Sequence, residues 1–459
     1  MDLFTTSLRG KSLTRLLGVV GALAFTLQGY DQAVANGTTV ALYEVGAALG
    51  ALSCAFIGDI LGRRRTVFYA GCVCIAGIII QATPFSLGQL IAGRLITAHR
   101  GRLVLLEGLF AIAGVALATW IDFGFYYAQK TSVSWRFPIA FQGIFAITVV
   151  SLVNFLPESP RWLVKKDRTE EAGDDDAPTE STAVARDIAN IRQSLLDDAE
   201  GTSGNPFAFT HNRHFHRTIL ALGVNLLAQM SGVNIITFYS DTIFEEQLGF
   251  SGTTARIISG CLQLWQVFAA GLGVLLIDRF GRRRLLIFSS AGMMVSQACL
   301  AGLQSDTTNK GASSASLLFF FTALFCFPIG FFLLPFMYAA EIAPLRIRSK
   351  VTAMSAGINW LFNFMIAEVT PIGFSTIGFR YYIIYAAINA FSVTVFYLFY
   401  PETKGRTLEE VDAIFAQSRN VFDPVKLARS LPFQEAVEAQ TDAKTAEAER
   451  EKEGWEESV

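Results

Sequence analysis

The sequence predicts an all-α, polytopic membrane protein built from two six-helix bundles, and three observations lead to this prediction. First, 52% of the 459 residues are hydrophobic and the mean hydropathy is +0.41, which is far more apolar than a soluble protein with one packed core. Second, the apolar runs are about long enough to cross a bilayer as helices. Third, a charged loop at residues 58–65, Gly-Asp-Ile-Leu-Gly-Arg-Arg-Arg, returns at residues 277–284 as Ile-Asp-Arg-Phe-Gly-Arg-Arg-Arg, which indicates two related halves.

The repeated loop also predicts the orientation of the chain in the membrane. Each copy holds an acidic residue, a glycine and three arginines, which cannot enter hydrocarbon, and such basic loops face the cytoplasm. Most other basic loop residues fall on the same side, so both termini and the central linker are expected to be cytoplasmic. The net charge of -2 gives no indication of nucleic-acid binding.

The first half comprises residues 1–161 and ends at Pro157 and Pro160, because two prolines so close together cannot continue a helix. Its fourth helix is truncated. The 14 residues of this span reach only about 21 Å, against about 30 Å of hydrocarbon. The six spans are expected at residues 13–35, 39–57, 66–82, 85–98, 103–127 and 137–155.

Residues 162–217 turn polar and are expected to form a cytoplasmic linker. The second half follows at residues 218–415. Residues 416–459 are highly charged and poor in aromatic residues, which predicts a disordered cytoplasmic tail. The six spans of the second half are expected at residues 218–240, 253–277, 285–303, 315–340, 351–374 and 379–400.

Two charged residues inside the predicted spans of the first half are candidates for proton coupling. Asp31 falls in the first span, and a carboxylate buried in a membrane is costly and seldom kept without a use. Arg94 is the strong cation of the short fourth span. A nearby arginine holds a carboxylate ionised, and a rearrangement that separates the two lets the carboxyl group take a proton. The alternative is that Asp31 is an outer-end residue that simply meets solvent.

Amide side chains concentrate in the predicted spans of the second half. Binding of a sugar or polyol needs amide donors and acceptors at mid-membrane depth and a flat ring beside them. Gln229 and Asn234 are five residues apart, about 140° around a straight helix, so they converge only if the backbone is irregular near Gly232. Asn359 and Asn363 share a helix face, with Trp360 beside them. The alternative for any one of these amides is a hydrogen bond between helices.

Charged residues at the predicted helix ends are candidates for a cytoplasmic gate, in which salt bridges between helices form and break as the protein changes state. The alternative is that they only anchor the topology. The histidines lie without carboxylate or cysteine partners at ligand spacing, so neither a metal nor a cofactor is expected. The gate candidates are Asp59, Arg63, Glu158, Asp278, Arg282, Glu341, Arg348 and Glu402.

The order of these motifs resembles the sugar porter branch of the major facilitator superfamily, from about residue 13 to residue 415. Trp120-Ile-Asp-Phe-Gly and the Asn359 segment look most like fungal sugar and polyol proton symporters. The motifs that carry the resemblance are Gly29-Tyr-Asp-Gln, both arginine loops, Gly93-Arg94, Pro157-Glu-Ser-Pro-Arg, Gln229-Met-Ser-Gly-Val-Asn, Glu341-Ile-Ala-Pro with Arg348, and Pro401-Glu-Thr-Lys-Gly-Arg.

The resemblance implies a major facilitator fold and a secondary active transporter, not an enzyme, that works by alternating access. Its expected partners are a small-molecule sugar or polyol, protons and the lipid bilayer of the plasma membrane. By resemblance, Asp31 is the proton acceptor and Arg94 its modulator, and Gln266 and Phe336 occupy substrate-binding positions beside the amides named above.

Several positions depart from the family's pattern. Ala228 replaces a glutamine, Phe238 a tyrosine, Phe336 a tryptophan and Gly108 a glutamine, so each loses a hydrogen bond or a larger ring. A smaller polyol or a less polar substrate than a hexose is therefore conceivable.

Two alternatives to a working transporter stay open at this point. One is a non-transporting sugar sensor or receptor. The other is an inactive product of an incomplete gene model, because a missing exon would explain both the very short first outer loop and the truncated fourth helix.

Overall fold

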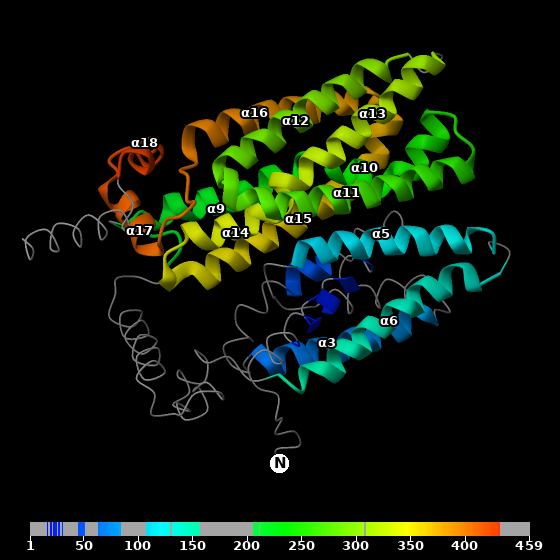
Figure 1. The fold of residues 1–459 in the computed structure, drawn as a ribbon, viewed down its shortest axis with the longest axis horizontal. Coiled ribbons are helices and arrows are strands. Elements are labelled where there is room, and N and C mark those ends of the chain that lie inside the picture. Colours follow the sequence, from blue (N-terminus) through cyan, green and yellow to red (C-terminus); the bar gives the residue numbers. More distant parts are fainter. Residues whose placement is uncertain are drawn as a thin grey trace, which may run out of the picture.

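A computed structural model describes residues 16, 19–20, 22–24, 26–27, 30, 45–50, 63–83, 107–128, 131–156, 205–210, 212–306 and 309–431. These residues form helices and connecting turns, without strands. The helices divide into a first-half group and a second-half group that lie side by side (Figure 1). The first and second predicted spans are described only at scattered positions, and the truncated fourth span lies outside the described residues.

The described helices of the first half are α3 (Arg63–Ala82), α5 (Glu107–Tyr126) and α6 (Val133–Val153). α3 packs along α6, and both contact residues of the first span through small apolar clusters (Figure 1). In one cluster Val20 packs with Val149 and Val153; in another Leu27 packs with Cys74. These contacts place the helix of the first span between α3 and α6.

The second half holds the main hydrophobic core, which runs through all its spans. Its six predicted spans are present as helices, and two of them are divided by breaks or π-helical turns. In chain order the elements are α9 (His214–Gln229), α10 (Val233–Thr242), η2 (Ile243–Gln247), α11 (Gly252–Phe280), α12 (Arg282–Leu303), α13 (Lys310–Phe327), η3 (Pro328–Phe332), α14 (Leu334–Ile342), α15 (Leu345–Ile377) and α16 (Arg380–Phe399).

Seven helical segments among the described residues are long and apolar enough to cross a membrane. The apolar part of α5, Phe110–Tyr126, is shorter than these. α15 has 33 residues but lies outside the set, because polar residues such as Asn359 and Asn363 lower its hydropathy. The seven segments are Arg64–Ala82, Val133–Val153, His214–Gln247, Gly252–Phe280, Arg282–Leu303, Gly311–Ile342 and Arg380–Phe399. The chain is therefore a multi-pass membrane protein, as its composition predicts.

The prediction of a disordered tail from residue 416 is wrong for residues 416–431. Helix α17 (Leu408–Gln417) begins at a capping box between Thr407 and Glu410, and it is followed by α18 (Asp423–Ser430). The reason is anchoring to the bundle: Phe422 stacks on Phe399 of α16 with ring centres 4.9 Å apart. Low aromatic content does not prevent a short helix from folding when one ring and buried small residues hold it to a larger core.

Hydrogen bonds at both ends of α18 add to this anchoring. The Arg406 guanidinium donates to the carbonyl groups of Ala428 and Leu431, both at 2.8 Å. Asp423 accepts from the backbone N–H groups of Asn420 at 2.7 Å and Arg419 at 2.9 Å, and these bonds hold the pKa of the Asp423 carboxyl group below its usual range.

The predicted linker also ends earlier than expected, because α9 begins at His214 rather than at residue 218. Arg217, predicted to lie in the linker, is 1% exposed inside the bundle. From composition alone a charged residue is assigned to a loop, but Arg217 is buried and forms an ion pair, which is described below.

The two halves meet along α5 and α11 (Figure 1). The indole of Trp120 lies against Gly260, where a Cβ atom would come within 2.9 Å of the ring. Further along the same pair of helices, the Arg256 guanidinium lies 4.0 Å from the centre of the Tyr126 ring. Glycine at position 260 thus lets a large ring of the first half approach the second.

Candidate functional site

The seventh span is broken near its middle. α9 ends at Gln229 and α10 begins at Val233, and between them Gly232 adopts a φ of +86°, the left-handed conformation that favours glycine. A Cβ atom on Gly232 would approach the Tyr385 ring and the Gln297 side chain to 2.8 Å. The irregular backbone that the sequence analysis requires at this glycine is confirmed.

The break brings three amide side chains into one hydrogen-bonded chain. Asn234 Nδ2 donates to Gln229 Oε1 at 2.7 Å, and Gln229 Nε2 donates to Asn359 Oδ1 of α15 at 2.7 Å. Asn234 and Asn359 are buried, and Gln229 is half-buried. We call these three residues the amide chain. Their convergence is confirmed, whereas their role in binding stays a prediction.

The other predicted substrate residues of the second half lie on the surrounding helices. Gln266 is buried on α11, and Asn363 is buried one turn beyond Asn359 on α15. Trp360 is half-buried and packs against Ala47 of the first half, and Phe336 is half-buried on α14. Within the described part of the chain, no hydrogen bond joins Gln266, Trp360 or Phe336 to the amide chain.

The predicted proton-coupling pair, Asp31 and Arg94, lies outside the described residues. The neighbouring Tyr30 is fully buried, with its ring 5.7 Å from Phe141 and 6.1 Å from Phe145 of α6. The backbone of the first span passes close to α5 at Gly114, where a Cβ atom would lie 2.8 Å from the Tyr30 nitrogen. At Tyr30 the first span thus contacts both α5 and α6.

The gate candidates of the second half converge at one end of the bundle. Arg282 Nη2 contacts Glu341 Oε1 at 2.8 Å, and Arg282 Nη1 contacts Asp278 Oδ1 at 3.3 Å. Thr403 donates its hydroxyl to Glu341 Oε2 at 2.6 Å. This cluster ties the neighbouring ends of α11, α12 and α14 and the segment after α16 into one network.

Glu402 belongs to the same cluster and caps helix α12. Its carboxylate accepts from the backbone N–H groups of Arg282 at 2.7 Å and Arg283 at 3.1 Å, the helix end where negative charge is stabilised. Arg348 instead donates its Nε to the Ala343 carbonyl at 3.1 Å.

The remaining gate candidates belong to the first half. Asp59 and Glu158 lie outside the described residues, and Arg63 is described only in its backbone. The contacts described above for the predicted gate therefore all belong to the second half.

Sequence analysis missed a second charged cluster, between α9 and α17. Arg217 Nη2 lies 2.5 Å from Asp412 Oδ1, and Arg217 Nε donates to the Ile342 carbonyl at 2.6 Å. The Arg217 guanidinium also lies 4.9 Å from the centre of the Phe415 ring. The helical spacing of Val411, Asp412 and Phe415 on a short amphipathic segment was the available signal.

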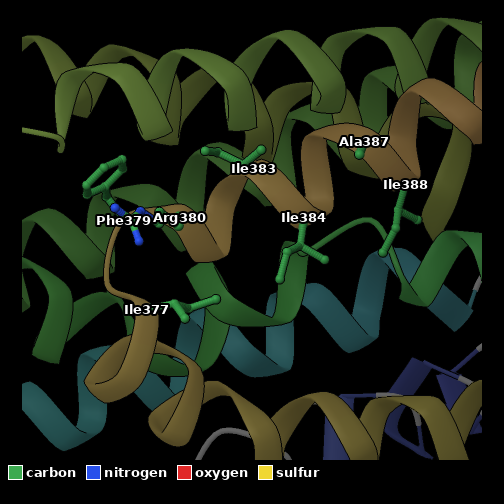
Figure 2. Close-up of a pocket in the computed structure, with 7 residues that line it drawn as sticks. All are labelled: Ile377, Phe379, Arg380, Ile383, Ile384, Ala387 and Ile388. Atoms are coloured by element: carbon green, nitrogen blue, oxygen red, sulfur yellow. The ribbon is translucent and has the colours of Figure 1, made fainter.

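An apolar groove lies at the junction of α15 and α16, and no residue of the amide chain lines it (Figure 2). Apart from Arg380 its lining is apolar, and Ile383 and Ile384 are 50% and 46% exposed. Such a lining offers no set of hydrogen-bonding groups for a sugar, so we do not assign the substrate site to it. Its lining residues are Ile377, Phe379, Arg380, Ile383, Ile384, Ala387 and Ile388.

The sequence is similar to known transporters over nearly its whole length. The profile of the family described as "Sugar (and other) transporter" matches residues 22–98 and 96–415. The MFS-type transporter oryC of Aspergillus oryzae is 31% identical over 491 aligned residues, covering 93% of this chain and 90% of that protein. The sugar transporter STL1 of Saccharomyces cerevisiae is 29% identical, covering 93% of this chain and 85% of that protein.

The fold is similar to solved structures of the xylose transporter XylE. The structure of the proton:xylose symporter XylE bound to 6-bromo-6-deoxy-D-glucose gives a TM-score of 0.74 at 21% identity, covering 88% of this chain and 99% of that chain. An inward-open structure of XylE from E. coli gives a TM-score of 0.67 at 20% identity, covering 87% of this chain and 99% of that chain. The major facilitator fold is therefore confirmed.

Proposed function

Because this chain belongs to the sugar (and other) transporter family, we propose that it is a secondary active transporter that moves a sugar or polyol across the plasma membrane in symport with protons. The observation that carries the substrate class is the amide chain of Gln229, Asn234 and Asn359. It lies at the break of a membrane-spanning helix, the kind of place where transporters form their binding sites.

The hydrogen-bonding pattern of the amide chain suits a molecule with neighbouring hydroxyl groups. Within the described residues, Asn234 Oδ1 and Asn359 Nδ2 take part in no hydrogen bond, while the inner atoms bond to Gln229. A hydroxyl group both donates and accepts, so one hydroxyl can donate to Asn234 Oδ1 and its neighbour can accept from Asn359 Nδ2. Trp360 and Phe336 supply flat apolar surface for the carbon skeleton.

Proton coupling is proposed from the sequence positions of Asp31 and Arg94. A membrane carboxylate next to an arginine changes its proton affinity when the two separate, and alternating access provides such a separation. Plasma-membrane localisation with cytoplasmic termini is proposed from the two arginine loops, of which Arg282 to Arg284 begin helix α12.

A second candidate, a product with impaired transport, is favoured by the comparisons at the short fourth span. The family profile matches in two pieces that meet at residues 96–98, where the span is expected to continue. The 491-residue alignment with the Aspergillus relative is also longer than this 459-residue chain, so the relative carries extra residues inside the aligned region.

Uptake of labelled sugars and polyols by cells that lack their own carriers tests the proposed function. We expect uptake to rise as external pH falls and to collapse with an uncoupler, because protons drive accumulation. Uptake that changes neither with external pH nor with the uncoupler would indicate facilitated diffusion instead of proton symport. No uptake at confirmed surface expression would favour the second candidate.

Asp31→Asn tests the proton-accepting residue. Asparagine keeps the shape of aspartate but cannot be protonated and deprotonated, so accumulation against a gradient should be lost. Exchange of labelled for unlabelled substrate should persist, since it needs no net proton movement. Accumulation equal to that of the unmodified chain at matched surface expression would contradict the proton role of Asp31.

A further inference from the structure

Two amides of other helices bond to backbone carbonyl groups at the break in the seventh span. Asn389 Nδ2 of α16 donates to the Ser231 carbonyl at 2.9 Å. Gln297 Nε2 of α12 donates to the Gly232 carbonyl at 3.4 Å. In a membrane, a carbonyl group that precedes a helix start, such as that of Ser231, needs a partner on a neighbouring helix, and Gln297 adds a second bond at the N-cap carbonyl of Gly232.

Both amides are completely buried and only partly satisfied. Gln297 and Asn389 are each 0% exposed, and Gln297 Oε1 and Asn389 Oδ1 have no hydrogen-bond partner among the described residues. A buried amide oxygen without a partner disfavours the folded state, so apolar side chains of similar size would serve packing better. The bonds to the break are therefore what these two residues contribute.

The same two helices also shape the space around Gly232. The Tyr385 ring of α16 and the Gln297 side chain both lie where a Cβ atom of residue 232 would be, and Asn389 Nδ2 also donates to the Tyr385 carbonyl at 2.8 Å. α12 and α16 therefore both contact the backbone at the break. Gln229 and Asn234 meet only while the backbone between them stays broken.

We propose that Gln297 and Asn389 are positioning residues for the substrate site: they hold the break of the seventh span so that Gln229 and Asn234 converge. They act through the backbone and do not contact the substrate. The expected effect on transport rests on the proposed function. The expected effect on the backbone at the break can be tested without any substrate.

The test replaces Gln297 by methionine, which keeps the length of the side chain and removes the amide. Gln304→Met is the matched control. It removes a buried glutamine at the C-terminal cap of the same helix, and within the described residues no hydrogen bond joins this side chain to the break. Asn389→Leu tests the second bond with a side chain of similar size.

The first readout is hydrogen–deuterium exchange of the purified full-length chain. Peptides that cover residues 230–236 should exchange faster in Gln297→Met and Asn389→Leu than in the unmodified chain, and Gln304→Met should leave them unchanged. Unchanged exchange at residues 230–236 in both test variants would overturn the proposal, whether or not the chain transports.

The second readout is the concentration dependence of uptake. Each test variant should raise the KM for the transported substrate about tenfold, with the maximal rate per surface-expressed molecule kept, because an unmade hydrogen bond in the site weakens binding. Because the effect passes through Gln229, Gln297→Met should add little to the KM of Gln229→Ala. Full additivity of the two changes, or an unchanged KM in Gln297→Met, would contradict the positioning role. An unmodified chain without uptake would instead count against the proposed function.

Discussion

At the residue scale, Gln229 is the central member of the amide chain, since it accepts from Asn234 and donates to Asn359. Replacing Gln229 or Asn359 by alanine should weaken substrate binding by about 1–3 kcal/mol, the usual range for a buried polar group that loses its partner. Binding to the purified chain, by calorimetry or by competition with a labelled sugar, measures this loss.

Asn225→Ala provides a control for that measurement. Asn225 is a buried amide one turn before Gln229, but it donates to the Pro335 carbonyl at 3.2 Å and to Ser355 Oγ at 2.7 Å, within the helix packing. This variant should lose stability without a matching loss of affinity. Equal affinity in Gln229→Ala, Asn359→Ala and the unmodified chain would place the substrate site elsewhere.

At the element scale, α17 is fixed to α9 by the buried Arg217. Asp412→Ala should lower the free energy of unfolding by about 1–3 kcal/mol. The usual cost of leaving a buried charge unpaired is larger, but the Asp412 side chain is 41% exposed and partly screened by solvent. Thermal unfolding in detergent measures the change.

A double replacement separates the ion pair from simple loss of packing. Replacing both Arg217 and Asp412 by leucine should cost less stability than Asp412→Ala alone, because no charge is then left buried without a partner. A double variant that is less stable than the single one would show that the guanidinium contributes mainly through the Ile342 carbonyl and the Phe415 ring.

A second prediction at this scale concerns the length of the short fourth span. Inserting about 20–25 residues of a related full-length span and loop between Ala98 and His99 supplies what a complete crossing requires. We expect the insertion to raise the transport rate, because a helix several ångströms too short displaces Arg94 along its axis relative to Asp31. Uptake at matched surface expression measures the effect, and robust transport by the unmodified chain would contradict it.

At the scale of the whole molecule, the second half could be predicted well from the sequence. Its apolar periodicity and charged loops mark the spans, and the spacing of Gln229 and Asn234 predicts the break at Gly232 that the structure contains. The clustering of Arg282, Glu341 and Glu402 was predictable because charged residues at helix ends have few partners other than each other, whereas their role as a gate stays a prediction.

The rest depends on contacts between segments far apart in the sequence. Nothing in the residues around Arg217 indicates that Asp412, nearly two hundred positions later, is its ion-pair partner. From the sequence alone, Arg217 is therefore assigned to the linker. The order of α18 likewise comes from its docking on α16 and from Arg406, not from its own composition. From the sequence alone, Gln297 and Asn389 cannot be distinguished from other intramembrane amides, because only the structure shows which carbonyl groups they bond to.

The length of α15 has a mechanical consequence for the transport cycle. Its 33 residues extend about 50 Å, well beyond the roughly 30 Å of hydrocarbon, and Asn359 lies near the middle, about 21 Å from one end and 27 Å from the other. A rigid rotation of about 10° around Asn359 swings both ends by about 4–5 Å in opposite directions. A rotation of α15 about Asn359, the amide that we propose contacts the substrate, would thus widen the passage on one side of the membrane and narrow it on the other.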